Sequence, residues 1–303
     1  MSYFKLLGLT REPFSTSPDP HFFFLSAAHR AALYRLRIAV SLRRGLCIVL
    51  GDVGTGKTTL SRRLAQLLPQ DGPIDLHVIL NPYFESDQHL LVALMEAFHI
   101  ETPQPAPASS TGARPGDGDG RAGGPGPLPP VRAMLSAIER HLFARGVEQG
   151  RIVTLLIDEA QQLSPSNLEL LRALLNYETQ DTKLLQLILM AQLECLPTLR
   201  TIRNLWDRVS LKYVLNPLDE GETKELITFR LTQAGWDGRE PLFTDDAVRD
   251  IHYATQGYPR RIALLCHDAL ERLVMDRQPV VTPAVIRGLI ERERELAGVH
   301  VPA

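Results

Sequence analysis

The segment Gly51-Asp-Val-Gly-Thr-Gly-Lys-Thr58 constrains this chain more than any other feature of its sequence. It matches the pattern GxxxxGK[ST], and it lies between a short apolar run, 46–50, and a stretch with helical periodicity, 58–68. Glycines at these positions let the backbone wrap around a phosphate with its N–H groups pointing inward, and the start of the following helix adds partial positive charge. The segment therefore predicts a phosphate-binding loop between a buried strand and a helix.

The residues of this loop have distinct predicted roles. Lys57 is expected to reach the β- and γ-phosphates of ATP, the Thr58 hydroxyl to ligate Mg2+, and Thr59 to contact the α-phosphate. The alternative, a glycine-rich turn with a surface lysine, fits the strand–loop–helix context poorly. The residues expected to bind the nucleotide are Gly51, Asp52, Val53, Gly54, Thr55, Gly56, Lys57, Thr58 and Thr59.

A second apolar run ends in two carboxylates. Residues 152–157 are apolar apart from one threonine, and Asp158 and Glu159 follow directly. This order places Asp158 beside the metal and Glu159 near the attacking water. Alone the pattern is weak, because many strands end in a solvated acid. Together with the phosphate loop it predicts hydrolysis rather than binding alone, with Glu159 as the residue that polarises water.

Strand and helix patterns alternate through the first two thirds of the chain and then give way to helices alone. Alternating strands and helices predict an α/β fold with a parallel sheet and helices on both faces. We therefore expect an α/β nucleotide-binding domain over 1–216 and a small all-α domain over 217–303. Strands are expected at 46–50, 76–80, 152–157, 185–190 and 211–214, and helices at 26–44, 58–68, 87–98, 131–145, 167–178, 220–234, 244–255, 260–275 and 282–295.

Residues 101–130 differ in composition from the rest of the chain, since Pro and Gly make up 15 of these 30 residues. Such a segment buries too little apolar surface to offset its chain entropy, so we expect a disordered insertion in the first domain. Elsewhere no apolar run approaches the roughly 20 residues that span a bilayer, and no secretory signal is evident. Three widely spaced cysteines exclude a disulfide scaffold, and a cytoplasmic location is expected.

The charges are unevenly distributed along the chain. Residues 1–70 hold ten Lys and Arg against three Asp and Glu, whereas residues 217–303 hold eleven against fifteen. Arg30, Arg37 and Arg44 recur every seven residues on one predicted helix. A solvated helix face explains this spacing, and so does a surface that tracks the phosphates of nucleic acid or anionic lipid. Composition alone does not choose between these interpretations.

Taken together, these motifs resemble the ExeA/GspA-type (general secretion pathway protein A-like) family of AAA+ ATPases, which is related to the TniB/TnsC-like transposition ATPases. The resemblance covers nearly the whole chain apart from 101–130 and the last few residues. It implies a P-loop NTPase (AAA+) fold, with a parallel sheet flanked by helices followed by a small all-α lid domain. The segments that carry it include Tyr3 to His29, the phosphate loop, Leu156-Ile-Asp-Glu-Ala-Gln161 and Gly257-Tyr-Pro-Arg-Arg-Ile262.

The resemblance also implies roles for residues outside the two nucleotide motifs. Gln192 stands where these ATPases place a polar sensor for the γ-phosphate, although their usual Gly-Gln-Pro-Glu reads Ala-Gln-Leu-Glu here. Arg208 stands where an arginine finger for the neighbouring subunit is expected, with Arg203 as the alternative. Arg260 matches the lid arginine that senses the nucleotide, with Arg261 as its competitor.

An arginine finger supplied in trans requires a neighbour, so the resemblance implies a homo-oligomeric ring or filament. Two roles follow for such an ATPase. It energises assembly of a cell-envelope secretion or pilus apparatus, or it binds DNA and selects targets for a transposase, which the basic N-terminal region favours. Members of the first type commonly carry a transmembrane segment and a peptidoglycan-binding region. This sequence shows neither, so that role implies a separate membrane partner and a location peripheral at the inner membrane. Glu159 argues against a third role, a slow nucleotide switch.

Overall fold

The computed structural model describes residues 2–15, 20–101 and 128–298, and the expected disordered insertion lies almost entirely outside these residues. The chain forms two compact units. The first comprises residues 1–34, 50–63 and 213–303, and the second comprises residues 35–49 and 64–212. Helices α2 (Ala27–Ser41) and α3 (Lys57–Leu67) each have residues in both units.

Five strands form one sheet in the order β2-β3-β4-β1-β5. β2 pairs with β3 and β3 with β4, both in parallel, so that Ile74 lies opposite Ile152 and Val153 opposite Leu185. Every residue of β1, β3 and β4 is buried, as expected for parallel strands covered on both faces, which explains why their apolar runs are broken only by Thr154 in β3 and Gln186 in β4. The expected parallel α/β sheet is confirmed. The strands are β1 (Leu46–Gly51), β2 (Ile74–Ile79), β3 (Ile152–Ile157), β4 (Leu185–Ala191) and β5 (Val209–Leu215).

The helices wholly within the second unit are α4 (Asp87–Ala97), α5 (Val131–Phe143), α6 (Pro165–Leu174), α7 (Leu196–Thr201) and α8 (Arg203–Trp206). The expected bounds of α6 are wrong at both ends. The helix begins earlier because Ser164 and Asn167 form a capping box with Pro165 in the first turn. It ends at Leu174, and Glu178 instead forms an isolated bridge with Lys183.

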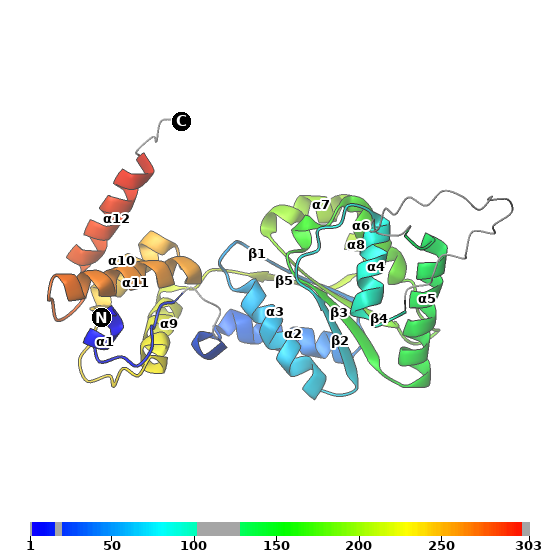
Figure 1. Ribbon diagram of the computed structural model, residues 1–303, viewed down its shortest axis with the longest axis horizontal. Coiled ribbons are helices and arrows are strands. Elements are labelled where there is room, and N and C mark those ends of the chain that lie inside the picture. Colours follow the sequence, from blue (N-terminus) through cyan, green and yellow to red (C-terminus); the bar gives the residue numbers. More distant parts are fainter. Residues whose placement is uncertain (1, 16–19, 102–127, 299–303) are drawn as a thin grey trace, which may run out of the picture. The chain divides into compact units, whose positions relative to one another are not determined.

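The first unit contains the four helices expected after Asp219. These are α9 (Glu220–Gln233), α10 (Asp245–Thr255), α11 (Pro259–Met275) and α12 (Pro283–Gly298), and the short α1 (Tyr3–Leu6) and the 3-10 turn Pro20–Phe22 belong to the same unit (Figure 1). Asp219 and Glu222 form a capping box at the start of α9, and the Thr244 side chain accepts from the Ala247 N–H at the start of α10. The all-α segment is therefore confirmed.

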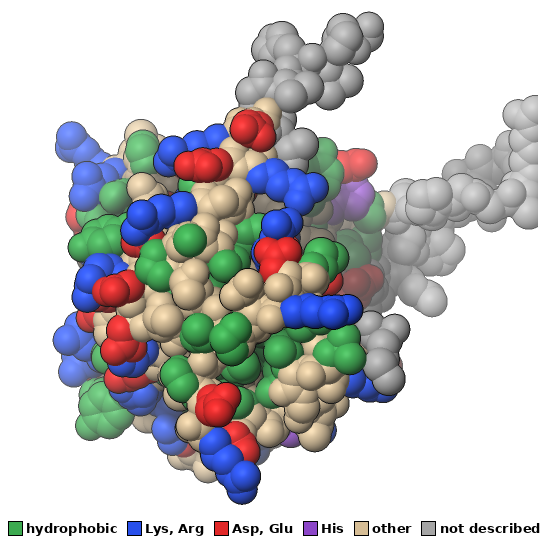
Figure 2. All heavy atoms as spheres, turned by 90° about the vertical axis from the view of Figure 1, so that its left-hand side faces the viewer, with side chains coloured by type: hydrophobic (Ala, Val, Ile, Leu, Met, Phe, Trp, Pro, Cys, Tyr) green, Lys and Arg blue, Asp and Glu red, His purple; other side chains and the backbone are tan. Residues whose placement is uncertain are grey.

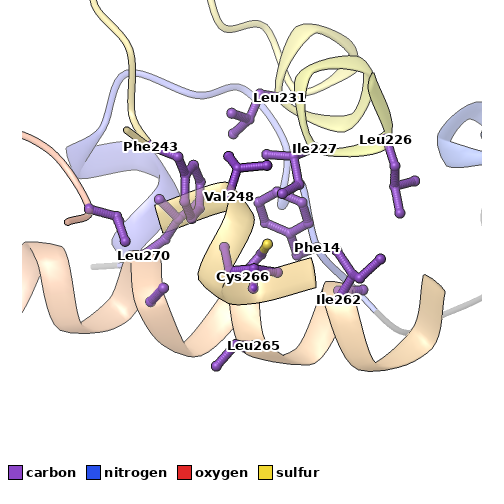
Figure 3. Packing of buried hydrophobic residues seen from close by; sticks show 14 of the residues in the cluster. Phe14, Leu226, Ile227, Leu231, Phe243, Val248, Ile262, Leu265, Cys266 and Leu270 are labelled. Atoms are coloured by element: carbon purple, nitrogen blue, oxygen red, sulfur yellow. The ribbon is translucent and has the colours of Figure 1, made fainter. Parts of the chain in front are cut away.

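The N-terminal segment contributes to the hydrophobic core of the first unit. Phe14 is 1% exposed and lies among side chains of α9, α10 and α11, with its ring edge-on to Phe243 at 6.2 Å between centroids (Figure 3). Thr10 donates to the Ala234 carbonyl at 2.9 Å, and the Arg230 guanidinium donates to the Ser15 carbonyl at 3.2 Å. Full burial of a phenylalanine contributes roughly 1.5–3 kcal/mol, so Phe14 anchors this segment.

On the face shown in Figure 2, acidic side chains are interspersed with basic and hydrophobic ones rather than gathered into one patch. Lys224 pairs with Asp245 at 2.7 Å, and Arg287 pairs with Asp250 at 3.1 Å. Exposed pairs of this kind contribute little stability, so these charges are best understood as a solvated helical surface.

Two of the three arginines spaced by seven are also engaged within the chain. Arg30 donates to the Leu25 carbonyl at 2.6 Å, and Arg37 forms a two-point ion pair with Asp71. Arg44 is exposed. For Arg30 and Arg37 these contacts favour the structural interpretation over a phosphate-tracking surface.

Replacement of Gly257 by Ala should destabilise the protein by about 3 kcal/mol. Gly257 has φ +73°, and an added Cβ would lie 1.9 Å from the Leu218 carbonyl oxygen, so the variant suffers both backbone strain and a clash. The control is Gly288→Ala, because Gly288 lies exposed in α12 with nothing within 4 Å of an added Cβ. That variant should gain up to about 1 kcal/mol. Denaturant unfolding measures both, and equal midpoints for the two variants would contradict the prediction.

Candidate active site

The loop between β1 and α3 requires its glycines. Gly54 and Gly56 have φ of +86° and +93°, in the left-handed region that favours glycine. Gly51 is required by packing instead, since an added Cβ would lie 2.7 Å from Thr55 Oγ1. The Thr55 hydroxyl donates to the Asp52 carbonyl at 2.8 Å and closes the loop. The sequence pattern therefore corresponds to a defined, tightly folded backbone.

Lys57 is the first residue of α3 and is 5% exposed. Its Nζ donates to the carbonyls of Gly51 at 2.8 Å and of Asp52 at 3.0 Å, so the ammonium group lies against the loop's own backbone. Thr58 and Thr59 follow in the first turn, both half-buried, while Val53 is 60% exposed. A buried cation and the start of a helix within one short loop form an environment suited to phosphate.

Residues from the start of α11 lie against this loop within the first unit. The Tyr258 hydroxyl donates to Asp52 Oδ2 at 2.7 Å, which raises the pKa of Tyr258. An added Cβ on Gly54 would lie 3.4 Å from the Cβ of Arg260. The Arg261 guanidinium instead lies 5.0 Å from the centre of the Tyr258 ring. Of the two arginines, Arg260 is thus the one whose stem adjoins the phosphate loop.

In the second unit, Asp158 and Glu159 follow β3 as expected. Asp158 is 1% exposed, and its Oδ1 accepts from the Glu159 N–H at 3.0 Å. Glu159 is half-buried and has φ 54° and ψ 38°, a left-handed conformation that costs a non-glycine residue about 1–3 kcal/mol. Contacts around the residue must maintain this conformation, which turns the Glu159 side chain away from the strand's regular alternation.

Two glutamine amides hold the Glu159 carboxylate. Gln161 Nε2 donates to Glu159 Oε2, and Gln192 Nε2 lies 3.5 Å from the same oxygen. The ring is closed by the Gln192 N–H, which donates to Gln161 Oε1 at 3.2 Å. Gln192 is the residue directly after β4, so this ring connects the ends of β3 and β4. The arrangement fixes the direction of the one carboxylate expected to act on water.

The two candidate arginine fingers lie in one connecting segment of the second unit. Arg203 is exposed at the start of α8, and Arg208 is half-buried immediately before β5. Between them, the Trp206 ring has the Lys212 ammonium 4.2 Å and the Arg200 guanidinium 5.6 Å from its centre. Which arginine serves as the finger stays a prediction.

Each unit therefore gathers part of the expected residues. The first holds the phosphate loop together with Arg260, and the second holds Asp158, Glu159 and Gln192. Sequence reasoning gave no role to Gln161 or Tyr258. Both lie in segments that carried the family resemblance, so a signal was present, but their partners become visible only in the fold.

The same is true of His29, a buried neighbour of the phosphate loop. Its Nε2 lies 3.1 Å from the Thr55 carbonyl oxygen, and its Nδ1 lies 2.8 Å from the Ser26 hydroxyl. The residue is 2% exposed, and burial lowers the pKa of His29 from 6.5 to about 4. His29 is therefore neutral at pH 7.

This shift predicts a loss of stability in acid. In the unfolded chain His29 takes up its proton near pH 6.5, whereas in the folded chain it does so only near pH 4. The part of the folding free energy that depends on a neutral His29 is fully present above about pH 6.5. It falls as the pH drops toward 4, and the loss is roughly 2 kcal/mol at pH 5. Urea unfolding of wild type and His29→Gln at pH 7 and pH 5 isolates the loss of stability that is due to His29. An equal loss in both proteins would contradict the prediction.

Within the part of the chain that the structure describes, no helix has the length and apolar character needed to cross a bilayer.

Comparisons with known proteins identify relatives of this chain. The AAA-domain family matches residues 41–199, which contain the phosphate loop and both carboxylates. General secretion pathway protein A of Aeromonas hydrophila is 36% identical over 270 residues, which cover 88% of this chain and 44% of that protein. The chain therefore spans less than half the length of this relative.

Solved structures share the fold at low identity. Cdc6p from Pyrobaculum aerophilum is 16% identical with a TM-score of 0.63, over 95% of this chain and 74% of that one. Drosophila ORC bound to DNA is 18% identical with a TM-score of 0.63, over 95% of this chain and 65% of that one. With the family match over more than half of its length, the chain belongs to the AAA-domain family and has the AAA+ P-loop NTPase fold.

Proposed function

We propose that this chain binds ATP with Mg2+ and hydrolyses it. The observation that carries the proposal is the phosphate loop, with its two left-handed glycines and the buried Lys57 ammonium at the start of α3. In this proposal the loop residues 51–59 hold the phosphates, and Lys57 moves from the loop carbonyls to the β- and γ-phosphates. Arg260 reads the nucleotide from the lid helices. The chemistry of the donors supports the choice of metal, because a hydroxyl and a carboxylate, from Thr58 and Asp158, are hard oxygen ligands of the kind Mg2+ takes. When bound, the ion neutralises developing phosphate charge.

The hydrolytic step is assigned to the Glu159 carboxylate. It orients the attacking water and accepts its proton, while the Gln192 amide contacts the γ-phosphate. Arg208 of one subunit, with Arg203 as the alternative, stabilises transition-state charge at the site of the next subunit. This trans contribution is why we propose a homo-oligomeric ring or filament, in which bound ATP holds neighbours together and hydrolysis releases them.

Replacement of Gln161 by Ala should lower kcat about tenfold with KM for ATP changed less than twofold. The amide bonds to the Glu159 carboxylate and to the Gln192 N–H, and a hydrogen bond to a charged group is worth enough to account for a factor of this size. The neighbouring Gln162 is exposed, so Gln162→Ala is a matched control. Steady-state phosphate release measures both. Equal kcat for the two variants would show that Gln161 does not position the Glu159 carboxylate for hydrolysis.

For the biological role we propose the assembly of a cell-envelope secretion or pilus apparatus, at the inner face of the inner membrane. The support is the 36% identity to general secretion pathway protein A over most of this chain.

The alternative is a DNA-binding ATPase that selects targets for a transposase. It is favoured by the basic balance of residues 1–70, ten Lys and Arg against three Asp and Glu. ATP turnover with and without double-stranded DNA at low salt separates the two roles. Stimulation by DNA that is lost in Arg44→Ala supports the DNA role. Turnover indifferent to DNA supports the envelope role.

A further inference from the structure

We propose that His29 is a positioning residue that fixes the orientation of the Thr55–Gly56 peptide, so that the Gly56 N–H points toward the phosphates of the nucleotide. The inference rests on the proposed function, since it concerns how the same loop is made ready for ATP. His29 and the loop lie in the same unit, although Thr55 lies 26 positions after His29 in the chain.

The hydrogen bonds around the imidazole have only one consistent direction. A carbonyl oxygen only accepts, so His29 Nε2 carries the proton and donates to the Thr55 carbonyl at 3.1 Å. In the neutral ring Nδ1 is then an acceptor, and the Ser26 hydroxyl at 2.8 Å donates to it. The Ser26 oxygen in turn accepts from the His29 backbone N–H at 3.3 Å. The low pKa of the buried ring is consistent with this neutral tautomer.

The orientation of the Gly56 N–H follows from peptide geometry. In a planar trans peptide the C=O and the following N–H point to opposite sides of the chain. With the Thr55 carbonyl held on the His29 side, the Gly56 N–H must point to the other side. Gly56 at φ +93° otherwise has unusual conformational freedom, because glycine tolerates many backbone orientations. A donor held in place before the ligand arrives costs no reorganisation on binding.

Packing reinforces this hydrogen bond. An added Cβ on Gly56 would lie 2.7 Å from His29 Nε2, so the ring is seated directly against the loop. The Phe23 ring is edge-on to the imidazole at 5.7 Å between centroids. The segment 23–29 thus supports the loop from the side of the Thr55 carbonyl.

The chain contains an internal control for the local motif. Ser86 and His89 form the same pair at the start of α4, with Ser86 Oγ 2.9 Å from His89 Nδ1 and the His89 N–H donating to Ser86 Oγ at 3.4 Å. His89 is exposed and belongs to the other unit. Loss of the Ser–His pair alone is therefore tested by His89→Ala, and loss of the loop contact by His29→Ala.

The binding experiment measures the Kd of ADP by calorimetry at pH 7.5 for wild type, His29→Ala, His29→Gln and His89→Ala. His29→Ala should raise Kd about tenfold, because the Gly56 N–H would then lose most of its charge-assisted hydrogen bond to the phosphate. His29→Gln should recover most of the affinity, since its amide N–H can donate to the same carbonyl, and His89→Ala should match wild type. Unchanged affinity in His29→Ala, or a glutamine variant no better than alanine, would overturn the proposal.

A second readout needs no nucleotide. The imidazole 15N spectrum of the wild-type protein should show His29 neutral with its proton on Nε2, and the Gly56 amide signal should broaden in His29→Ala. A proton on Nδ1, or an unchanged Gly56 signal, would overturn the inference even if ADP binds. If wild type binds neither ADP nor ATP, the proposed function fails, and these spectra still decide whether His29 orients the peptide.

Discussion

Replacement of Glu159 by Gln should lower ATP turnover by about 10²- to 10⁴-fold while the Kd of ATP changes less than about threefold. The substitution removes the base but keeps an oxygen that can accept from Gln161, so the ring of Glu159, Gln161 and Gln192 is retained. The variant should therefore fold and hold ATP without cleaving it. Calorimetric binding and phosphate release, measured on the same preparation, separate the two effects.

The control for this substitution is Glu169→Gln. Glu169 lies on α6 with its side chain 47% exposed and paired with Arg172, so the same change of charge at that position should leave turnover close to wild type. If Glu159→Gln keeps more than a tenth of the wild-type rate, another group activates the water and the assignment of Glu159 is wrong.

Replacement of Lys57 by Met should raise the Kd of ATP about 100-fold and reduce turnover to background. The ammonium group is the buried point charge of the loop, and removal of one such stabilising donor from a transition state costs about 10²–10³ in rate. Methionine keeps the length and apolar stem of the side chain but cannot donate to the Gly51 and Asp52 carbonyls, so the unfolding temperature without nucleotide should fall somewhat. The stabilisation that ATP gives the wild type should disappear.

Lys224→Met provides the matched comparison. Lys224 is an exposed lysine of α9 that pairs with Asp245, far along the chain from the phosphate loop. The Lys224→Met variant should bind ATP as wild type does, and ATP should raise its unfolding temperature by the same amount. A Lys57→Met protein that still gains stability from ATP would show that the nucleotide does not bind at this loop.

The fold was largely predictable because its strands are of the parallel, fully covered kind. β1 and β3 appear in the sequence as apolar runs, broken in β3 only by Thr154, and helices of the first unit begin at recognisable caps such as Thr244. Periodicity could not reveal α7 and α8, which are six and four residues long, too short to repeat a helical pattern. The capping box at Ser164 outweighed the apolar pattern in setting the start of α6.

The candidate site was predictable only where its chemistry lies in consecutive residues. Lys57 belongs to the contiguous phosphate-loop motif and Glu159 to the apolar run that ends in two carboxylates, and each motif indicates its chemistry without reference to distant residues. The contacts of Gln161, His29 and Tyr258 are with residues far away in the chain. The sequence separations are 31, 26 and 206 positions respectively, and no local pattern contains such pairs. The choice of Arg260 over Arg261 as the neighbour of the loop likewise required the packing at Gly54.

ATP hydrolysis by this chain is best tested by the rate of phosphate release from ATP and Mg2+, measured per chain over a wide range of protein concentrations. We expect turnover that requires Mg2+ and rises with protein concentration, because an arginine from a neighbouring chain completes each site. Mixing Arg208→Ala with an excess of Glu159→Gln should restore activity, since each supplies what the other lacks. Release at background level at every concentration, in a protein that is folded and binds ATP, would contradict the claim.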